Sequence, residues 1–127
     1  RVWGLAADAS AAWVLSGPAD PGSQPGGSGR LRRLDPQTAR VTAATPLPDL
    51  VTILAVGPVI GGGAVWLAGA YAGQQQGNGV LLRVDPASGR VTGWLRSQLV
   101  FSTVLAAGPR GAWVSAGGPE LLYVVEA

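Results

Sequence analysis

The sequence predicts an all-β repeat protein, and three observations support this prediction. The phrase "LRRLDPQTARV" (31–41) returns 50 residues later as "LLRVDPASGRV" (81–91). Short apolar stretches alternate with clusters of Gly, Pro and Ser, which bound strands and form turns. No apolar period of 3.6 residues persists for ten residues, so no helix is expected.

Each repeat divides into short strands. They are expected over residues 2–7, 12–16, 30–34 and 40–44 in the first repeat, over 51–56, 64–68, 80–84 and 90–95 in the second, and over 103–107, 111–115 and 121–125 in the third. Four strands in a unit of about 50 residues are typical of propeller blades. The sequence therefore predicts one segment of a partial β-propeller. It has about three blades of four antiparallel strands (about 1–47, 48–98 and 99–127), and the last blade lacks its outer strand.

The repeated Asp-Pro phrase has the composition of a hairpin turn. Each proline presets φ for the first corner, and each aspartate can accept a hydrogen bond from an N–H two residues on. Gly89 can adopt the left-handed conformation, which costs Ala39 in the first copy about 1 kcal/mol. A pair of catalytic or metal-binding carboxylates is the less favoured interpretation. The residues expected to form these turns are Asp35, Pro36, Asp85, Pro86 and Gly89.

Three tryptophans recur at the same place in the repeat. Trp13, Trp66 and Trp113 each follow a turn of small residues and lie on the second strand of a unit. We expect them to pack between neighbouring blades, where a large apolar side chain is buried. Stacking against a sugar is the alternative. Trp3 and Trp94 do not fit the pattern and are given no role.

The composition excludes several kinds of chemistry. Cys and His are both absent, which removes disulfides, thiol nucleophiles, thiolate or imidazole metal sites and every triad that uses His. The chain has nine arginines and seven carboxylates, and only Arg30, Arg32 and Arg33 cluster in sequence. A solvated strand face explains this cluster better than nucleic-acid binding, which needs a basic stripe. No nucleic-acid partner, metal or cofactor is therefore expected.

No apolar run approaches the roughly 18–20 residues that a membrane-spanning helix needs. The chain begins at Arg1 without a signal peptide, so we interpret it as a processed product or an excerpt of a longer protein. The compartment stays open, and an extracytoplasmic domain of a bacterial protein is one interpretation.

The repeat as a whole resembles a known family. A turn of small residues, then "AVW" and an apolar strand, then "GRLRRLDPQTARVTAATPLP", is similar to the repeats of streptogramin B (virginiamycin B) lyase-like propellers, with YVTN and PQQ-like propellers as relatives. The resemblance covers most of residues 5–95 and returns in 105–116. It implies a propeller fold. The lyases form a seven-bladed ring and eliminate across an ester with a catalytic His and bound magnesium. This chain has no His, so the resemblance transfers no catalytic residue.

The loops between the second and third strands are long in the first two repeats, "GPADPGSQPGGSG" (17–29) and "GAYAGQQQGNG" (69–79). Long loops on one rim of a rigid scaffold commonly bind ligands. Their amides suit hydrogen bonding to a small polar ligand or peptide, and flexible spacer loops are the alternative. An enzyme would need Asp20 or Asp49 as base and Arg96 as anion clamp. The candidate ligand-binding residues are Asp20, Gln24, Asp49, Tyr71, Gln74, Gln75, Gln76, Asn78, Arg96 and Gln98.

An incomplete ring needs a partner. The stretch from Leu121 to Val125 would be an exposed apolar edge strand, which further chain, a second copy or a different subunit has to cover. The function expected is a non-catalytic ligand-binding or protein-interaction domain, a sensor or scaffold of a larger bacterial protein. The alternative is a fragment of a propeller enzyme, a lyase or hydrolase, whose catalytic residues lie in blades that this chain does not carry.

Overall fold

A computed structural model describes residues 2–17, 29–47, 56–70, 79–97, 105–116 and 121–126. These residues form three separate antiparallel sheets and no helix. The first sheet contains β1 (Val2–Ala7), β2 (Ala12–Ser16), β3 (Arg30–Leu34) and β4 (Val41–Pro46). The second contains β5 (Val56–Gly61), β6 (Ala64–Ala70), β7 (Gly79–Val84) and β8 (Val91–Ser97). The third contains β9 (Leu105–Gly108), β10 (Gly111–Ala116) and β11 (Leu121–Glu126). The all-β prediction is confirmed.

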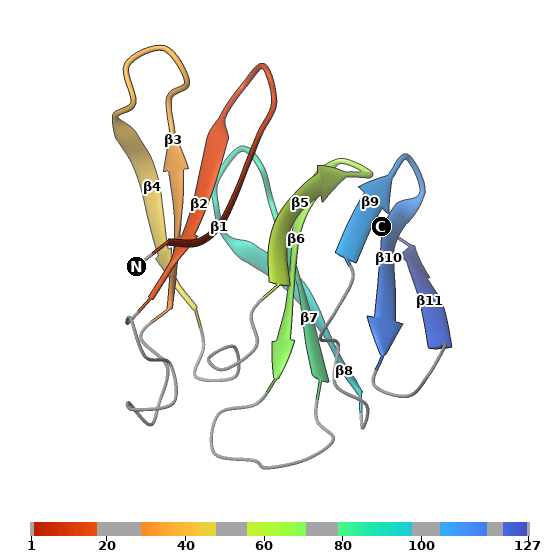
Figure 1. Ribbon diagram of the computed structural model, residues 1–127. Coiled ribbons are helices and arrows are strands. Elements are labelled where there is room, and N and C mark those ends of the chain that lie inside the picture. The colour runs from red at the N-terminus through yellow and green to blue at the C-terminus, as the bar shows by residue number, and fades with distance from the viewer. Residues whose placement is uncertain are drawn as a thin grey trace.

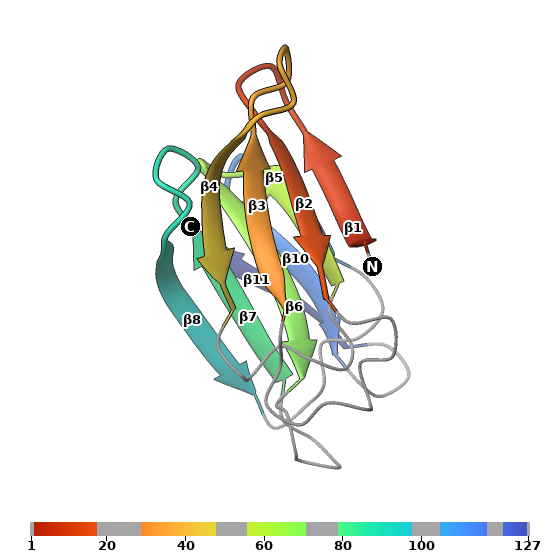
Figure 2. The ribbon, with the colours of Figure 1, turned by 90° about the vertical axis from the view of Figure 1, so that its left-hand side faces the viewer.

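Strand order within each sheet follows the chain, so each strand pairs with its neighbours in sequence. The three sheets stand side by side, and their first strands β1, β5 and β9 lie next to one another (Figure 1). The view along the stack shows β1 to β4 in front of the other two sheets (Figure 2). No sheet closes on itself, and no helix in the described part of the chain is long and apolar enough to cross a membrane.

The main departure from the expected strands is at the start of the second sheet. The apolar run 51–56 predicted the first strand there, whereas β5 begins at Val56 and continues to Gly61. The pair Gly62 and Gly63, both with positive φ, forms a tight turn that places β5 against β6. The turn fixes the register, and the strand continues to Gly61, five residues beyond the predicted end. Residues 51–55 lie outside the described residues.

Two apolar cores lie between the sheets, and both use the faces of the second sheet. In β6, alternate residues point to opposite sides, and all five from Ala64 to Ala68 are buried. Val65 and Leu67 join Trp13 and Leu15 in the core between the first and second sheets. The opposite core, towards the third sheet, is smaller. It consists of Ala64, Trp66, Ala68, Leu81, Ala112 and Val114.

Glycine allows the first strands to approach closely. A Cβ at Gly4 on β1 would collide with the carbonyl oxygen of Gly57 on β5. On the other side of β5, a Cβ at Gly61 would lie 2.8 Å from the Cβ of Ala107 on β9. Both distances are shorter than van der Waals contact allows, so these two positions require glycine for the sheets to converge at their first strands.

Candidate functional site

The Asp-Pro phrases form hairpin turns. In the first, the carboxylate of Asp35 accepts the N–H of Gln37 at 2.8 Å, and the carbonyl of Asp35 accepts the N–H of Ala39 at 2.8 Å. Asp35 and Arg40 close the loop through a backbone hydrogen bond of 2.9 Å. In this turn, the carboxylate therefore organises its own loop, as the turn interpretation predicts.

The second turn is built in the same way, with one additional side chain. The hydroxyl and the N–H of Ser88 donate to a carboxylate oxygen of Asp85, at 2.7 and 3.0 Å. The Ser88 side chain, more than any other group, lowers the pKa of Asp85 from its ordinary value. A third carboxylate, Asp8, has a lowered pKa in the turn before β2. The hydroxyl of Ser10 donates to it at 2.7 Å, and this hydrogen bond is the main cause of the lowered pKa.

The left-handed position of the turn is occupied differently in the two copies. Gly89 has φ 75°, and Ala39 has φ 58°. Gly89 is buried, whereas Ala39 is exposed. A Cβ at Gly89 would lie 3.1 Å from the Cβ of Ala43 on the first sheet. Glycine at position 89 therefore suits both the conformation and the close contact of the second turn, whereas the first turn holds an alanine in the same left-handed conformation.

The second turn lies against the face of the first sheet, and two side chains hold it there. Arg33 donates from Nε to the carbonyl of Pro86 at 3.0 Å, and the hydroxyl of Thr45 donates to the carbonyl of Gly89. The guanidinium of Arg33 also lies 6.0 Å from the ring centre of Trp13, within the range of a cation–π contact. The two hydrogen bonds join consecutive repeats through residues that are 53 and 44 positions apart in sequence.

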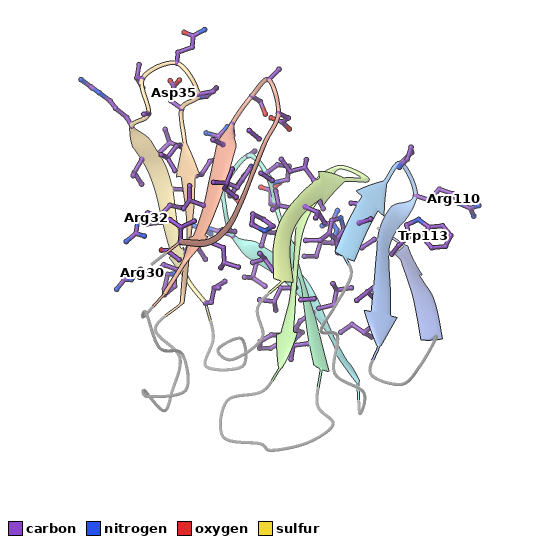
Figure 3. The ribbon with its side chains drawn as sticks, viewed as in Figure 1. Arg30, Arg32, Asp35, Arg110 and Trp113 are labelled. Carbon is purple, nitrogen blue, oxygen red and sulfur yellow. The ribbon has the colours of Figure 1, made fainter. Side chains whose placement is uncertain are left out.

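The three clustered arginines do not share one solvated face. Arg30 is exposed, and Arg32 donates to the hydroxyl of Ser16 at 2.7 Å, both on the outward face of the first sheet (Figure 3). Arg33 points to the opposite face, towards the second sheet. The expectation of a single solvated face is wrong for Arg33, because adjacent residues of a strand point to opposite sides.

The outward face of the first sheet differs chemically from the matching face of the second. The registers place Arg30 and Arg32 where the second sheet has Val80 and Leu82, each of them buried. Two guanidinium groups therefore replace two aliphatic side chains on this face. The first sheet is adapted there to water or to a polar neighbour.

The structure places the three repeated tryptophans in two environments. Trp13 and Trp66 are buried between sheets, and the indole of Trp66 donates to the carbonyl of Gly61 at 2.9 Å. Trp113, which was also expected to pack between blades, is 45% exposed. It lies on the outward face of the third sheet (Figure 3). Its neighbours Ala112 and Val114 are buried in the core with the second sheet, so Trp113 lies on the face turned away from that sheet.

Most of the candidate ligand-binding residues lie outside the described residues: Asp20, Gln24, Asp49, Tyr71, Gln74, Gln75, Gln76, Asn78 and Gln98. Arg96 is on β8, and its side chain is not described. The strand ends from which these loops depart gather at one end of the sheets, opposite the Asp-Pro turns (Figure 1).

The sequence analysis gave no role to the pair of Arg33 and Thr42. The same Arg–Thr pair recurs 50 residues later, at Arg83 and Thr92, and this recurrence could have indicated its importance.

Comparison with protein-family models, with curated proteins and with solved structures gave no match for this chain. Within the described ranges there is no group of three or more acidic residues placed to hold a metal ion.

Proposed function

We propose that the chain is a segment of a β-propeller that binds a ligand or partner without catalysing a reaction. The arrangement of the sheets supports the propeller. Strands follow one another in each sheet, the first strands are adjacent, and each sheet lies against the next. Blades surround a propeller axis in this way. The resemblance to streptogramin B lyase-like repeats points to the same fold.

One observation carries the proposal of a binding role: the repeated polar side chains make their contacts within the scaffold. Asp35 and Asp85 organise turns, and Arg33 and Thr45 hold one turn against the preceding sheet. These groups therefore build the scaffold. We assign ligand binding to the loops at the opposite end, which are rich in Gln and Asn and lack a strong base.

A binding assay on arrays of oligosaccharides and peptides tests this proposal. The 127-residue chain is compared with a triple variant, Gln74→Ala, Gln75→Ala and Gln76→Ala. The matched control is Gln37→Ala, which removes an exposed amide from the turn at the other end of the sheets. We expect binding to one class of probe, lost in the triple variant and kept in the control.

Two outcomes contradict the proposal. One is the absence of binding to every probe, or binding that the triple variant retains in full. The other is turnover of an ester, glycoside or peptide substrate that disappears when Asp20→Asn and Asp49→Asn are combined, because those two residues are the candidate bases. That result would make the chain part of an enzyme.

A further inference from the structure

The side chain of Arg32 reaches along β3 to the level of Arg30. Its Nη1 donates to the hydroxyl of Ser16 at 2.7 Å. Ser16 pairs in register with Arg30, whereas Arg32 itself pairs with Val14. Residues two positions apart on a strand point to the same face, and their Cα atoms are about 7 Å apart. The side chains of Arg30, Arg32 and Ser16 therefore share one region of the outward face of the first sheet (Figure 3).

This region has hydrogen-bond donors to offer a ligand. Ser16 accepts from Arg32, so its own O–H can still donate. The contact with Ser16 engages only Nη1 of Arg32, which leaves the other N–H groups of that guanidinium for a ligand. Arg30 is exposed. In the part of the chain that the structure describes, neither arginine forms an ion pair, so both positive charges are accessible to an anion.

The carboxylates of the turns in the first sheet lie away from this region. Asp35 follows β3, at the end of the strand opposite Arg30 (Figure 3). Asp8 lies in the turn before β2, where it accepts from Ser10. Ser16 is at the other end of β2. The two guanidinium groups therefore create a local positive potential that these turns do not neutralise, and such a potential attracts anions.

Neighbouring positions on this face differ together between the first and second sheets. The second sheet holds aliphatic side chains, a glycine and a tryptophan where the first holds arginines, a serine and an alanine. The equivalent pairs are Arg30 and Val80, Arg32 and Leu82, Ser16 and Gly69, and Ala44 and Trp94. The small, exposed Ala44 pairs with Arg32 and leaves space beside its guanidinium. Contact with water requires polar side chains alone, whereas this space also admits a ligand.

The charge and the donors of the region match a phosphomonoester. Such a group carries about two negative charges at neutral pH and has three strong acceptor oxygens. Arg30 and Arg32 match the charges, and the O–H of Ser16 adds a neutral donor. Arginine binds phosphate oxygens through parallel N–H groups, which makes it well suited to this role. A carboxylate has a single charge and fewer oxygens, so it would leave part of the region without a partner.

We propose that Arg30, Arg32 and Ser16 form a binding site for a phosphomonoester group. The guanidinium groups of Arg30 and Arg32 donate to the phosphate oxygens, together with the hydroxyl of Ser16. The rest of the ester occupies the space beside Ala44. The site consists of strand residues, and the amides of the loops take no part in it. Its test is therefore separate from that of the proposed ligand binding.

The probes are methyl phosphate, methyl sulfate and acetate, each titrated into the 127-residue chain at constant ionic strength. Binding is followed by the NMR signals of the arginine Nε–H groups and of the Ser16 amide. We expect methyl phosphate to shift the signals of Arg30, Arg32 and Ser16 to saturation, with a Kd of about 1 mM. Methyl sulfate and acetate carry a single charge and should bind about tenfold more weakly or less. A sugar phosphate and a phosphoserine peptide then compete with methyl phosphate, and the tighter competitor identifies the source of the group.

Matched variants locate the site. Arg30→Gln removes an exposed side chain and should weaken the binding of methyl phosphate by about tenfold or more, with an unchanged melting temperature. Arg90→Gln is the control, because Arg90 is equally exposed and lies in the turn at the other end of the sheets. Arg32→Lys keeps the charge, removes the planar fork and should weaken binding by about threefold or more.

The triple variant of Gln74, Gln75 and Gln76 should bind methyl phosphate as the unchanged chain does, so failure of one proposal is distinguishable from failure of the other. The proposal of a phosphate site is overturned if no probe gives saturable shifts, or if acetate binds as tightly as methyl phosphate. It is also overturned if Arg30→Gln and Arg90→Gln have equal effects, or if the triple variant loses the binding of methyl phosphate.

Discussion

Arg33 donates from its Nε to the main-chain carbonyl of Pro86, at 3.0 Å, across the boundary between the first and second sheets. The two residues are 53 positions apart, and the hydrogen bond fixes the turn of one repeat on the face of the one before it. The repeated sequence therefore encodes the hairpin of each sheet together with part of the attachment between sheets.

We expect Arg33→Lys to lower the free energy of unfolding by about 1–3 kcal/mol, because lysine keeps the charge and loses the Nε donor. Arg32→Lys is the control, since Arg32 lies on the same strand and points to the outward face. Its effect should be below about 0.5 kcal/mol. Urea unfolding of both variants measures the difference. Equal effects would mean that the hydrogen bond to Pro86 does not stabilise the fold.

Ala39→Gly should raise the free energy of unfolding by up to about 1 kcal/mol. Ala39 has φ 58°, a conformation that glycine adopts without steric strain, and the gain is reduced by the larger entropy of glycine in the unfolded chain. Gly89→Ala should be destabilising by more than this amount, because it adds a contact of 3.1 Å with Ala43 to the same conformational strain. Thermal melting checks both. A lower melting temperature for Ala39→Gly would count against the turn geometry.

We expect part of the pH dependence of stability to come from the hydrogen bond between the Ser88 hydroxyl and the Asp85 carboxylate. The pKa of Asp85 is lower in the folded chain than its ordinary value, so ionised Asp85 stabilises the fold above the ordinary carboxyl range of about pH 4. This contribution is lost as the pH falls through the lowered pKa. Ser88→Ala should therefore raise the pKa of Asp85 and destabilise the chain at pH 6 more than at pH 2.5. Ser16→Ala, which removes a hydroxyl that accepts from Arg32, should show no such dependence on pH. Urea unfolding at the two pH values decides.

The two environments of the tryptophans predict different costs of truncation. Trp66→Ala should destabilise by about 3–5 kcal/mol, because Trp66 is 2% exposed and fills the core between the second and third sheets. Trp113→Ala should cost less than about 1 kcal/mol in the isolated chain, since the side chain is 45% exposed. Similar losses in chemical denaturation would show that the outward face of the third sheet is covered in solution.

The sequence was sufficient for the all-β class, for most strand positions and for the turns at Asp35 and Asp85. These features depend on residues that are close in sequence. Proline fixes φ in the turn, and the short aspartate side chain accepts hydrogen bonds from the backbone of its own turn. The continuation of β5 to Gly61 was not predicted, because an apolar run does not specify a register, whereas the glycine turn at residues 62–63 does.

The attachment between sheets could not be predicted from strand patterns alone. The alternation of a strand places Arg33 opposite Arg32, but it does not say which face meets the next sheet. The packing of Trp113 between blades stays a prediction, since its burial depends on a neighbour on the outward face that the described residues do not include. The repeat of Arg33 and Thr42 at Arg83 and Thr92 was the available signal for the attachment.

The most direct test of this account is a nuclear Overhauser measurement between the ring of Trp13 and the Hα protons of Gly89. The position of a Cβ on Gly89 lies 4.0 Å from Cζ3 of Trp13, so the two groups are close only when the second turn lies on the first sheet. We expect a cross-peak between them in the folded chain. With both residues assigned and the chain folded, the absence of this cross-peak would contradict the stacking of the sheets on which the propeller proposal depends.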